Sequence, residues 1–176
     1  HPRDWNGNRS HARKLQSYRV EAEWYRSWNR KLYPPENPRS HCKTAQTIAS
    51  VSQDEEFIFL LEDLDASGFS DRHQHLDVPT AKIVLNWLAT FHAHFLQSSP
   101  RGLWPIGTYW HLATRPDELA AIPNSEPLHQ FADEIDRRLN HCDYPTIVHG
   151  DAKVANFCFS PNRQAVAAVD FQYVGG

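Results

Sequence analysis

The stretch that decides the fold is residues 147–176, IVHGDAKVANFCFSPNRQAVAAVDFQYVGG. Two apolar runs rich in β-branched residues, 146–148 and 165–169, flank its centre. Each run delivers an acidic residue at or just past its end, Asp151 after the first and Asp170 after the second. Such runs are typical of short buried strands, so both predict strands that enter one site.

A polar residue with an amide side chain follows the first run. Asn156 lies five residues after Asp151, and the apolar pattern resumes directly behind it at 157–159. A Pro-Asn pair then supplies turn chemistry, so 157–159 and 165–169 can pair as a hairpin. That hairpin would place Asn156 and Asp170 at the same end, where their oxygens could meet one metal ion.

This trio of side chains fits phosphoryl transfer. In that reaction a carboxylate orients the acceptor hydroxyl and takes its proton, while an amide oxygen and a second carboxylate hold Mg²⁺ on the nucleotide phosphates. Mg²⁺ prefers hard oxygen ligands and keeps several waters, so one Asn and one Asp suffice. The layout matches the catalytic-loop and metal-aspartate motifs of protein kinases, with Gly150 in place of Arg and Gln172 in place of Gly.

The segments VHGDAKVANFCF and VAAVDFQYVGG resemble those of the aminoglycoside phosphotransferase and choline kinase superfamily. The closer resemblance is to its ecdysteroid-kinase-like branch, which includes bacterial members of unknown substrate, and it covers nearly the whole chain from about Ser17 onward. The resemblance implies that Asp151 is the catalytic base and that Asn156 and Asp170 bind Mg²⁺. If Asp151 only capped a turn and Asp170 only ended a buried strand, the spacing of the set would be unexplained.

Two neighbours of Asp151 also have expected roles. His149 is expected to serve the fold, by packing and hydrogen bonding behind the catalytic loop as the resemblance implies. Lys153 could neutralise charge on the transferring phosphate, or it could be a solvated loop lysine. The sequence leaves both interpretations of Lys153 open.

Near the N-terminus, residues 11–32 predict one amphipathic helix, because apolar side chains recur at helical spacing and a Pro-Pro pair follows. In kinases a small-lobe helix carries a Glu that pairs with the phosphate-binding Lys. Glu21 resembles that residue, with Glu23 as the next choice. Alternatively, both are solvated charges on the helix surface.

Residues 44–51 and 56–61 predict two strands around a polar turn, the second apolar enough for burial on both faces. The second strand ends in an acidic segment. By resemblance this is the hinge between two lobes, where main-chain groups of Glu62, Asp63 and Leu64 would meet the adenine edge of a nucleotide. A solvated acidic turn is the alternative.

Two further helices are predicted, a mostly buried one at 80–97 and one at 120–141 with an apolar stripe. An aromatic loop at 102–111 lies between them. It could wall an acceptor pocket, a reading that Trp110→Ala would test, or it could pack on its own aromatic side chains.

Composition limits the remaining possibilities. The chain has 176 residues, 40% of them hydrophobic, enough for one domain or two small lobes. A net charge of −3, with both signs interspersed, offers no basic stripe for nucleic acid. No apolar run reaches bilayer length and no signal-peptide core is present, so a cytoplasmic protein without membrane attachment is expected.

The cysteines form an odd, scattered set, Cys42, Cys142 and Cys158, which argues against a disulfide framework. Two of them directly follow histidines, but the spacing does not let one loop or helix face present two zinc ligands. We therefore expect ordinary buried or half-buried thiols.

The expected fold is α+β and protein-kinase-like with two lobes. Residues 1–64 would form an incomplete small lobe with the hinge, and residues 65–176 a mainly helical large lobe with the catalytic loop, truncated at its C-terminus. No glycine-rich loop or strand Lys precedes His11, and the chain contains no Met. We therefore expect a piece of a longer polypeptide.

The expected function is an ATP- and Mg²⁺-dependent phosphotransferase that acts on a hydroxyl group of a small molecule. The missing glycine-rich loop and Lys favour an alternative, a catalytically inactive kinase-like protein that binds nucleotide or a partner. A metal-dependent hydrolase that uses the same two aspartates is a third reading. The acceptor and the oligomeric state cannot be read from the chain.

Overall fold

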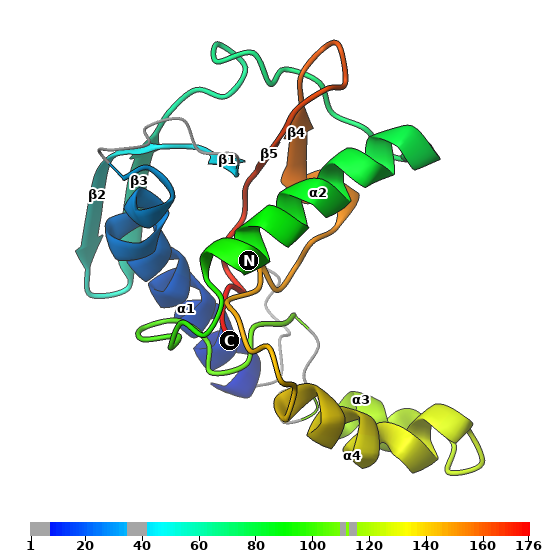
Figure 1. The fold of residues 1–176 in the computed structure, drawn as a ribbon. Helices are drawn as coiled ribbons and strands as arrows, with labels where there is room; N and C mark the ends of the chain where they lie inside the picture. Colours follow the sequence, from blue (N-terminus) through cyan, green and yellow to red (C-terminus); the bar gives the residue numbers. More distant parts are fainter. Residues whose placement is uncertain (1–7, 35–41, 110–111, 113–115) are drawn as a thin grey trace.

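The computed structural model describes residues 8–34, 42–109, 112 and 116–176 (Figure 1). The elements of the chain, in order, are α1 (Asn8–Glu23), η1 (Trp24–Trp28), η2 (Asn29–Leu32), β1 (Lys43–Thr44), β2 (Thr47–Gln53), β3 (Glu56–Leu61), α2 (Val78–His94), α3 (Pro116–Ala121), α4 (Pro127–Asn140), η4 (Val154–Asn156), β4 (Phe157–Phe159) and β5 (Val166–Ala168). Helices thus combine with small sheets, which confirms the α+β class. No helix in the described ranges is long and apolar enough to cross a membrane.

The predicted N-terminal helix is present, but its geometry changes along its length. It is α-helical in α1, π-helical in η1 and 3-10 in η2. A π turn widens the helix locally and shifts the side chains that follow it. Within this segment Trp24, Tyr25 and Trp28 are buried.

The strands form two separate sheets. One sheet has the order β1-β5-β4, with β1 parallel and β4 antiparallel to β5, and the other is the antiparallel pair β2-β3. The prediction of one strand over 44–51 was therefore wrong. The run divides at Ala45 and Gln46, where side chains replace the ladder: Asn29 donates to the Ala45 oxygen (2.7 Å) and Glu62 accepts from the Gln46 N–H (3.0 Å).

Strand β3 is covered on one face only, contrary to the expectation from its apolar run. Phe57 and Phe59 pack against Tyr18 and Tyr25 of the N-terminal helix. Alternate residues point away from that helix and stay exposed, Ile58 by 65% and Leu60 by 56%. An alternating side-chain direction leaves half of the strand uncovered wherever only one layer packs on the sheet.

Helix α2 begins at the N-cap Asp77, whose carboxylate accepts the Thr80 N–H at 2.9 Å. It buries one face, with Val84, Trp87 and Phe91 in the core. The prediction of a mostly buried helix was wrong, because an apolar residue on the opposite side, Leu85, is 62% exposed.

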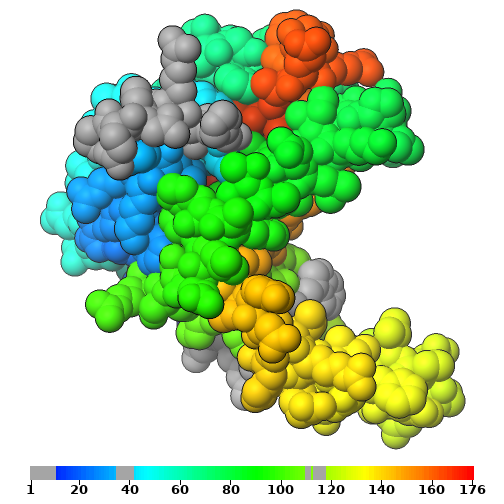
Figure 2. All heavy atoms as spheres, viewed as in Figure 1, coloured from blue at the N-terminus to red at the C-terminus, as the bar shows by residue number. Residues whose placement is uncertain are grey.

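Residues 120–141, predicted as one helix, belong to two. Helix α3 and helix α4 are separated by residues 122–126, where Pro123 interrupts the pattern. Figures 1 and 2 show the α3–α4 pair extending away from the rest of the chain. All the apolar residues that predicted this helix are exposed: Leu128, Phe131, Ile135 and Leu139.

An aromatic cluster forms the main core. Its centre is Phe171, which stacks on Trp24 with a ring separation of 4.2 Å and an interplanar angle of 12°. Phe91 of α2 and His149 contact the same ring at 6.3 and 4.8 Å. The cluster thus joins the N-terminal helix, α2 and the C-terminal segment.

All three cysteines are free thiols. Cys42 and Cys158 are buried, as expected. Cys142 follows α4 and is exposed, so the expectation of a buried or half-buried thiol was wrong for this residue.

Candidate active site

The hairpin predicted from the C-terminal stretch is present. β4 and β5 pair antiparallel with Phe157 opposite Ala168, and the Val169 N–H donates to the main-chain oxygen of Asn156 at 3.0 Å. This register puts Asn156 and Asp170 at the same end of the hairpin. Asn156 directly precedes β4, and Asp170 lies two residues after β5, so both are at this end of the hairpin.

Asp151 lies on the loop that enters this hairpin. Its carboxylate accepts a hydrogen bond from the Lys153 ammonium at 2.7 Å and one from the Asn156 amide at 3.2 Å. The Asn156 amide also donates to the Asp151 main-chain oxygen, at 2.8 Å. The bond to Asp151 raises the pKa of Lys153. The three predicted residues of this loop are therefore in direct contact.

The Asp151 carboxylate is 15% exposed and the Lys153 side chain 57%. Solvent screens an ion pair at this level of exposure, so the pair orients the carboxylate more than it stabilises the fold.

His149 is buried behind the loop and holds it from inside. Its Nε2 donates to the Val169 oxygen at 3.0 Å, and its Nδ1 accepts the Asp151 N–H at 3.3 Å. Burial lowers the pKa of His149, and the Val169 oxygen with the negative charges of Asp170 and Asp151 offsets this only in part, so the ring is neutral. The structure agrees with the expected packing role of His149.

Gly150, where protein kinases have Arg, is required by its backbone. Its φ is +81°, and a Cβ built there would lie 1.9 Å from the main-chain oxygen of Tyr173. The loop that contains Gly150 and Asp151 thus crosses directly over the segment that follows Asp170, at a distance that only glycine permits.

Asp170 has two features that fit a cation ligand. Its φ is +63°, in the left-handed region that a residue with a side chain rarely adopts. Its Oδ1 is buried, and no hydrogen-bond partner is found for it within the described ranges. A buried carboxylate oxygen without a partner is unfavourable unless something binds it, so the donor set here suits Mg²⁺.

Of the two glutamates considered in the N-terminal helix, Glu21 faces the site. Burial, together with the negative charge of Asp170, raises the pKa of Glu21 to about 7, while the Gln172 side chain and the Phe171 N–H bind the carboxylate and oppose that shift. Glu23 instead pairs with Arg26. From the sequence, Glu21 is the first choice for the small-lobe glutamate and Glu23 is the second. The surroundings of the two side chains in the structure favour Glu21.

The segment predicted as the hinge packs on the β4–β5 hairpin. The side chain of Leu64 is buried in a small apolar cluster with Cys158 and Ala167. Its main-chain N–H has no hydrogen-bond partner within the described ranges. These features leave one main-chain donor available beside an apolar surface, as an adenine-binding hinge requires.

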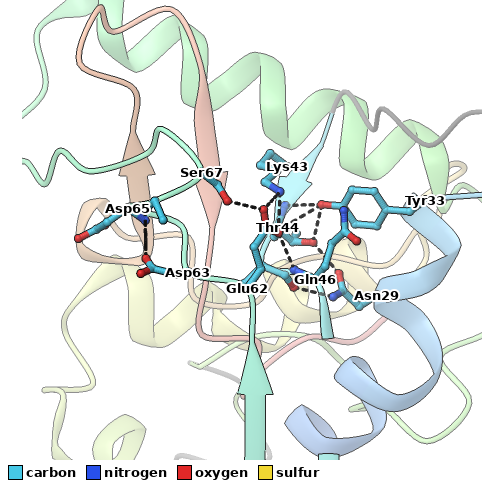
Figure 3. Close-up of polar contacts among 11 residues, drawn as sticks. Asn29, Tyr33, Lys43, Thr44, Gln46, Glu62, Asp63, Asp65 and Ser67 are labelled. Carbon is cyan, nitrogen blue, oxygen red and sulfur yellow. Dashed lines mark hydrogen bonds and ion pairs between the residues drawn. The ribbon is translucent and has the colours of Figure 1, made fainter. Parts of the chain in front are cut away.

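The acidic side chains of the hinge are occupied elsewhere (Figure 3). The Glu62 carboxylate accepts from Lys43 at 2.6 and 2.7 Å and from Ser67 at 2.7 Å. Asp63 accepts the N–H of Asp65 at 2.9 Å and closes a tight turn. Contacts from Glu62 or Asp63 to a nucleotide are therefore restricted to their main chain.

The aromatic loop, described over residues 102–109, packs against Gly150 and the segment that follows Asp170. The sequence alone did not predict these contacts. The indole N–H of Trp104 donates to the main-chain oxygen of Gln172 at 2.8 Å. Tyr109 contacts the Tyr173 ring edge-on at 4.8 Å and donates its N–H to the Gly150 oxygen at 2.8 Å. Trp110, the residue chosen to test a pocket, lies outside the described residues. The aromatic residues of this loop indicate in the sequence that the loop packs against something, but they do not specify which part of the chain it contacts.

No group of three or more His, Cys, Asp or Glu side chains that could hold a metal ion is found in the part of the chain that the structure describes. His92 and His94, two apart on α2, contact different rings, Phe91 and Phe95. A cation site here depends on the mixed pair of Asn156 and Asp170.

Comparison with known proteins gives one match. The family model described as the ecdysteroid kinase-like family matches residues 2–97, a range that contains the N-terminal helix, strands β1 to β3 and helix α2. No curated protein and no solved structure matches the chain. The matched range ends before Asp151, so the assignments in the C-terminal half rest on its own residues.

Proposed function

Because the chain belongs to the ecdysteroid kinase-like family, we propose that it is an ATP- and Mg²⁺-dependent phosphotransferase that phosphorylates a hydroxyl group of a small molecule. The observation that carries this proposal is the grouping of Asp151, Lys153 and Asn156 at the end of the hairpin that also delivers Asp170. Family membership supports a kinase-like enzyme in general, and this grouping supports the specific reaction.

Asp151 would act on the acceptor. Its carboxylate is partly exposed and positioned by two donors, so it can accept a hydrogen bond from an incoming hydroxyl and take its proton. His149, neutral and bonded on both ring nitrogens, is not available for that step. The acid–base role therefore falls to Asp151.

Asn156 and Asp170 would hold the metal. Mg²⁺, when bound, would neutralise charge on the nucleotide phosphates. Asn156 uses its amide nitrogen to bind Asp151, which orients its amide oxygen away from that contact. Asp170 offers the buried oxygen that has no partner in the described part of the chain. Both ligands are hard oxygens, as Mg²⁺ requires.

Lys153 and Glu21 would complete the charge distribution. Lys153 stays protonated beside Asp151 and lies close enough to stabilise negative charge on a transferring phosphoryl group. Glu21 sits against the Asp170 segment, where a kinase-like site needs a carboxylate to pair with a phosphate-binding Lys. The nucleotide base would meet the main chain of the hinge at Glu62, Asp63 and Leu64.

We propose a small lobe over residues 1–64 and a large lobe over residues 65–176, with the hinge at their boundary. The aromatic core crosses this boundary through the stacking of Trp24 on Phe171, and β1 pairs with β5 across it. Any movement between the lobes would therefore need to preserve that packing.

We propose that the acceptor binds in a cavity near Asp151. A cavity of about 790 Å³ lies between α4 and the loop that contains Gly107 and Thr108, and Val148 lines it three residues before Asp151. Its lining is mainly apolar, as small-molecule sites usually are, and the described residues that line it lack the basic surface that a nucleic acid would need. A cytoplasmic location would supply both ATP and Mg²⁺.

The test is ADP production by the full-length protein with alcohols, aminoglycosides, choline-like amines and sterols as acceptors. Asp151→Asn serves as the blank, and Asp133→Asn, on the exposed side of α4, is the matched control. The proposal predicts acceptor-dependent ADP that Asp151→Asn lowers by several orders of magnitude. Phosphate release without any acceptor would indicate a hydrolase. Nucleotide binding without turnover would indicate an inactive kinase-like protein.

A further inference from the structure

The side chain of Gln172 joins the metal-binding segment to the N-terminal helix. Its Oε1 accepts a hydrogen bond from the Lys14 ammonium at 3.1 Å and lies 3.4 Å from the Ser17 hydroxyl. Its amide group also binds the Glu21 carboxylate. One amide thus reaches three residues spaced over two turns of a helix that is far away in sequence.

The contacts differ in strength. Ser17 is completely buried, and its hydroxyl also donates to the Lys14 main-chain oxygen at 2.8 Å. A hydroxyl has one proton, so the shorter bond takes it most of the time. Lys14 is therefore the main donor to Gln172, and a charged donor makes the stronger hydrogen bond.

The main chain of the same segment is fixed independently. The Gln172 oxygen accepts the Trp104 indole N–H at 2.8 Å, and Phe171 stacks on Trp24. These contacts set the depth of the segment in the core. The Gln172 side chain instead contacts the helix earlier along its length, at Lys14 and Ser17, on the other side of Glu21 from Trp24.

We propose that Gln172 is a positioning residue that clasps the N-terminal helix to the Asp170 segment and so holds Glu21 beside the metal ligand. The inference rests on the proposed function and goes beyond it, because protein kinases have Gly at this position and Gly has no side chain to make such a clasp. Glu21 and Asp170 must be in place together for the nucleotide phosphates to be bound correctly. Misplacement of a positioning group by about 1 Å costs about 10²-fold in rate.

The test compares Gln172→Met with Gln164→Met in the full-length protein. Met preserves the length and most of the volume of Gln but provides neither the acceptor nor the donor. Gln164 lies in the exposed turn of the hairpin and is the matched control. Amide hydrogen exchange over residues 8–23 and steady-state kinetics are measured for both variants.

For Gln172→Met we expect faster exchange along α1 and a kcat lower by about 10- to 100-fold, with the KM of the acceptor changed by less than about threefold. Gln164→Met should match the parent in both measurements. Lys14→Ala should reproduce part of the effect, and Lys14→Ala combined with Gln172→Met should be less than additive, because both remove the same bond.

A charge exchange provides a rescue. Glu21→Gln combined with Gln172→Glu retains an amide and a carboxylate facing each other and still offers an acceptor to Lys14. This double variant should recover the slow exchange of α1 that Gln172→Met loses.

Unchanged exchange in Gln172→Met would overturn the clasp, and faster exchange with unchanged kcat would overturn the positioning role. If the parent makes no ADP with any acceptor, the proposed function fails, and the positioning role fails with it. Hydrogen exchange would still show whether the clasp itself exists, so the two failures are distinguishable.

Discussion

The side-chain amide nitrogen of Asn156 lies 2.8 Å from the main-chain oxygen of Asp151 and 3.2 Å from its carboxylate. This contact fixes which end of the Asn156 amide faces Asp151, so its oxygen is the end left for the proposed cation. It also couples the proposed base to a proposed metal ligand. Substitution of either residue should therefore disturb the other.

Gly150→Ala should destabilise the protein severely. The new Cβ would lie 1.9 Å from the Tyr173 oxygen, and the main chain on both sides would have to move. Gly68→Ala is the matched control, because Gly68 also has a positive φ, +90°, but nothing lies within 4 Å of its Cβ. Backbone strain alone costs about 1–3 kcal/mol, so chemical denaturation should show that loss for Gly68→Ala and a clearly larger one for Gly150→Ala. Equal losses would refute the close crossing.

Phe171→Ala should cost about 3–5 kcal/mol of unfolding free energy, because it removes a fully buried ring at the centre of the aromatic core. Phe131→Ala removes the same group from α4, where Phe131 is 57% exposed, and should cost less than about 1 kcal/mol. Denaturant titration of the two variants measures both. A similar cost for both would mean that Phe171 is not the centre of the core.

Glu21→Gln should change how stability depends on pH. In the folded protein the pKa of Glu21 is raised from 4.5 to about 7, chiefly by burial and next by Asp170, while Lys14 acts in the opposite direction. Between these two pH values the folded state keeps a proton that the unfolded state has released, so the parent loses stability as the pH rises through this window.

The loss is complete above pH 7 and amounts to at most about 3 kcal/mol. In Glu21→Gln this contribution is absent, so the variant should gain stability relative to the parent between pH 4.5 and 7. Thermal denaturation without Mg²⁺ over that range tests it, with Glu23→Gln as control. A pH-independent difference between parent and variant would contradict the raised pKa.

Substitution of the acidic hinge side chains should leave nucleotide affinity almost unchanged. Burial acts to raise the pKa of Glu62, but bonds from Lys43, Ser67 and the Gln46 N–H lower it more, so the carboxylate is committed to these partners. Asp63 is held in its turn. We expect the Kd of ATP to change by less than about threefold in Glu62→Gln and in Asp63→Asn, since the proposed contacts of this segment with the nucleotide involve its main-chain groups. Isothermal titration calorimetry measures this Kd. A tenfold loss of ATP affinity in either variant would mean that the substituted side chain contacts the nucleotide base.

The sequence predicted the hairpin and the grouping of its polar ends because these depend on short-range rules. Short continuous apolar runs, a Pro-Asn turn and a fixed spacing place Asn156 and Asp170 together without reference to the rest of the chain. The same local reasoning identified the N-terminal helix and the turn between β2 and β3.

The errors have a common physical origin. Whether Ile58 or Leu85 is buried depends on what packs against the second face of β3 and α2, and no local pattern contains that information. The division of 44–51 arises from long-range bonds made by Asn29 and Glu62. The clasp from Gln172 to Lys14 spans 158 residues and was equally invisible in the sequence.

The central claim is that Asn156 and Asp170 hold one divalent ion on a bound nucleotide. Water-proton relaxation with Mn²⁺–ADP measures this directly, because relaxation is enhanced when the complex binds the protein. The account predicts enhancement in the full-length parent and in Asp133→Asn, and affinity lower by about tenfold or more in Asn156→Ala and Asp170→Asn. Parent-like affinity in both ligand variants would contradict it.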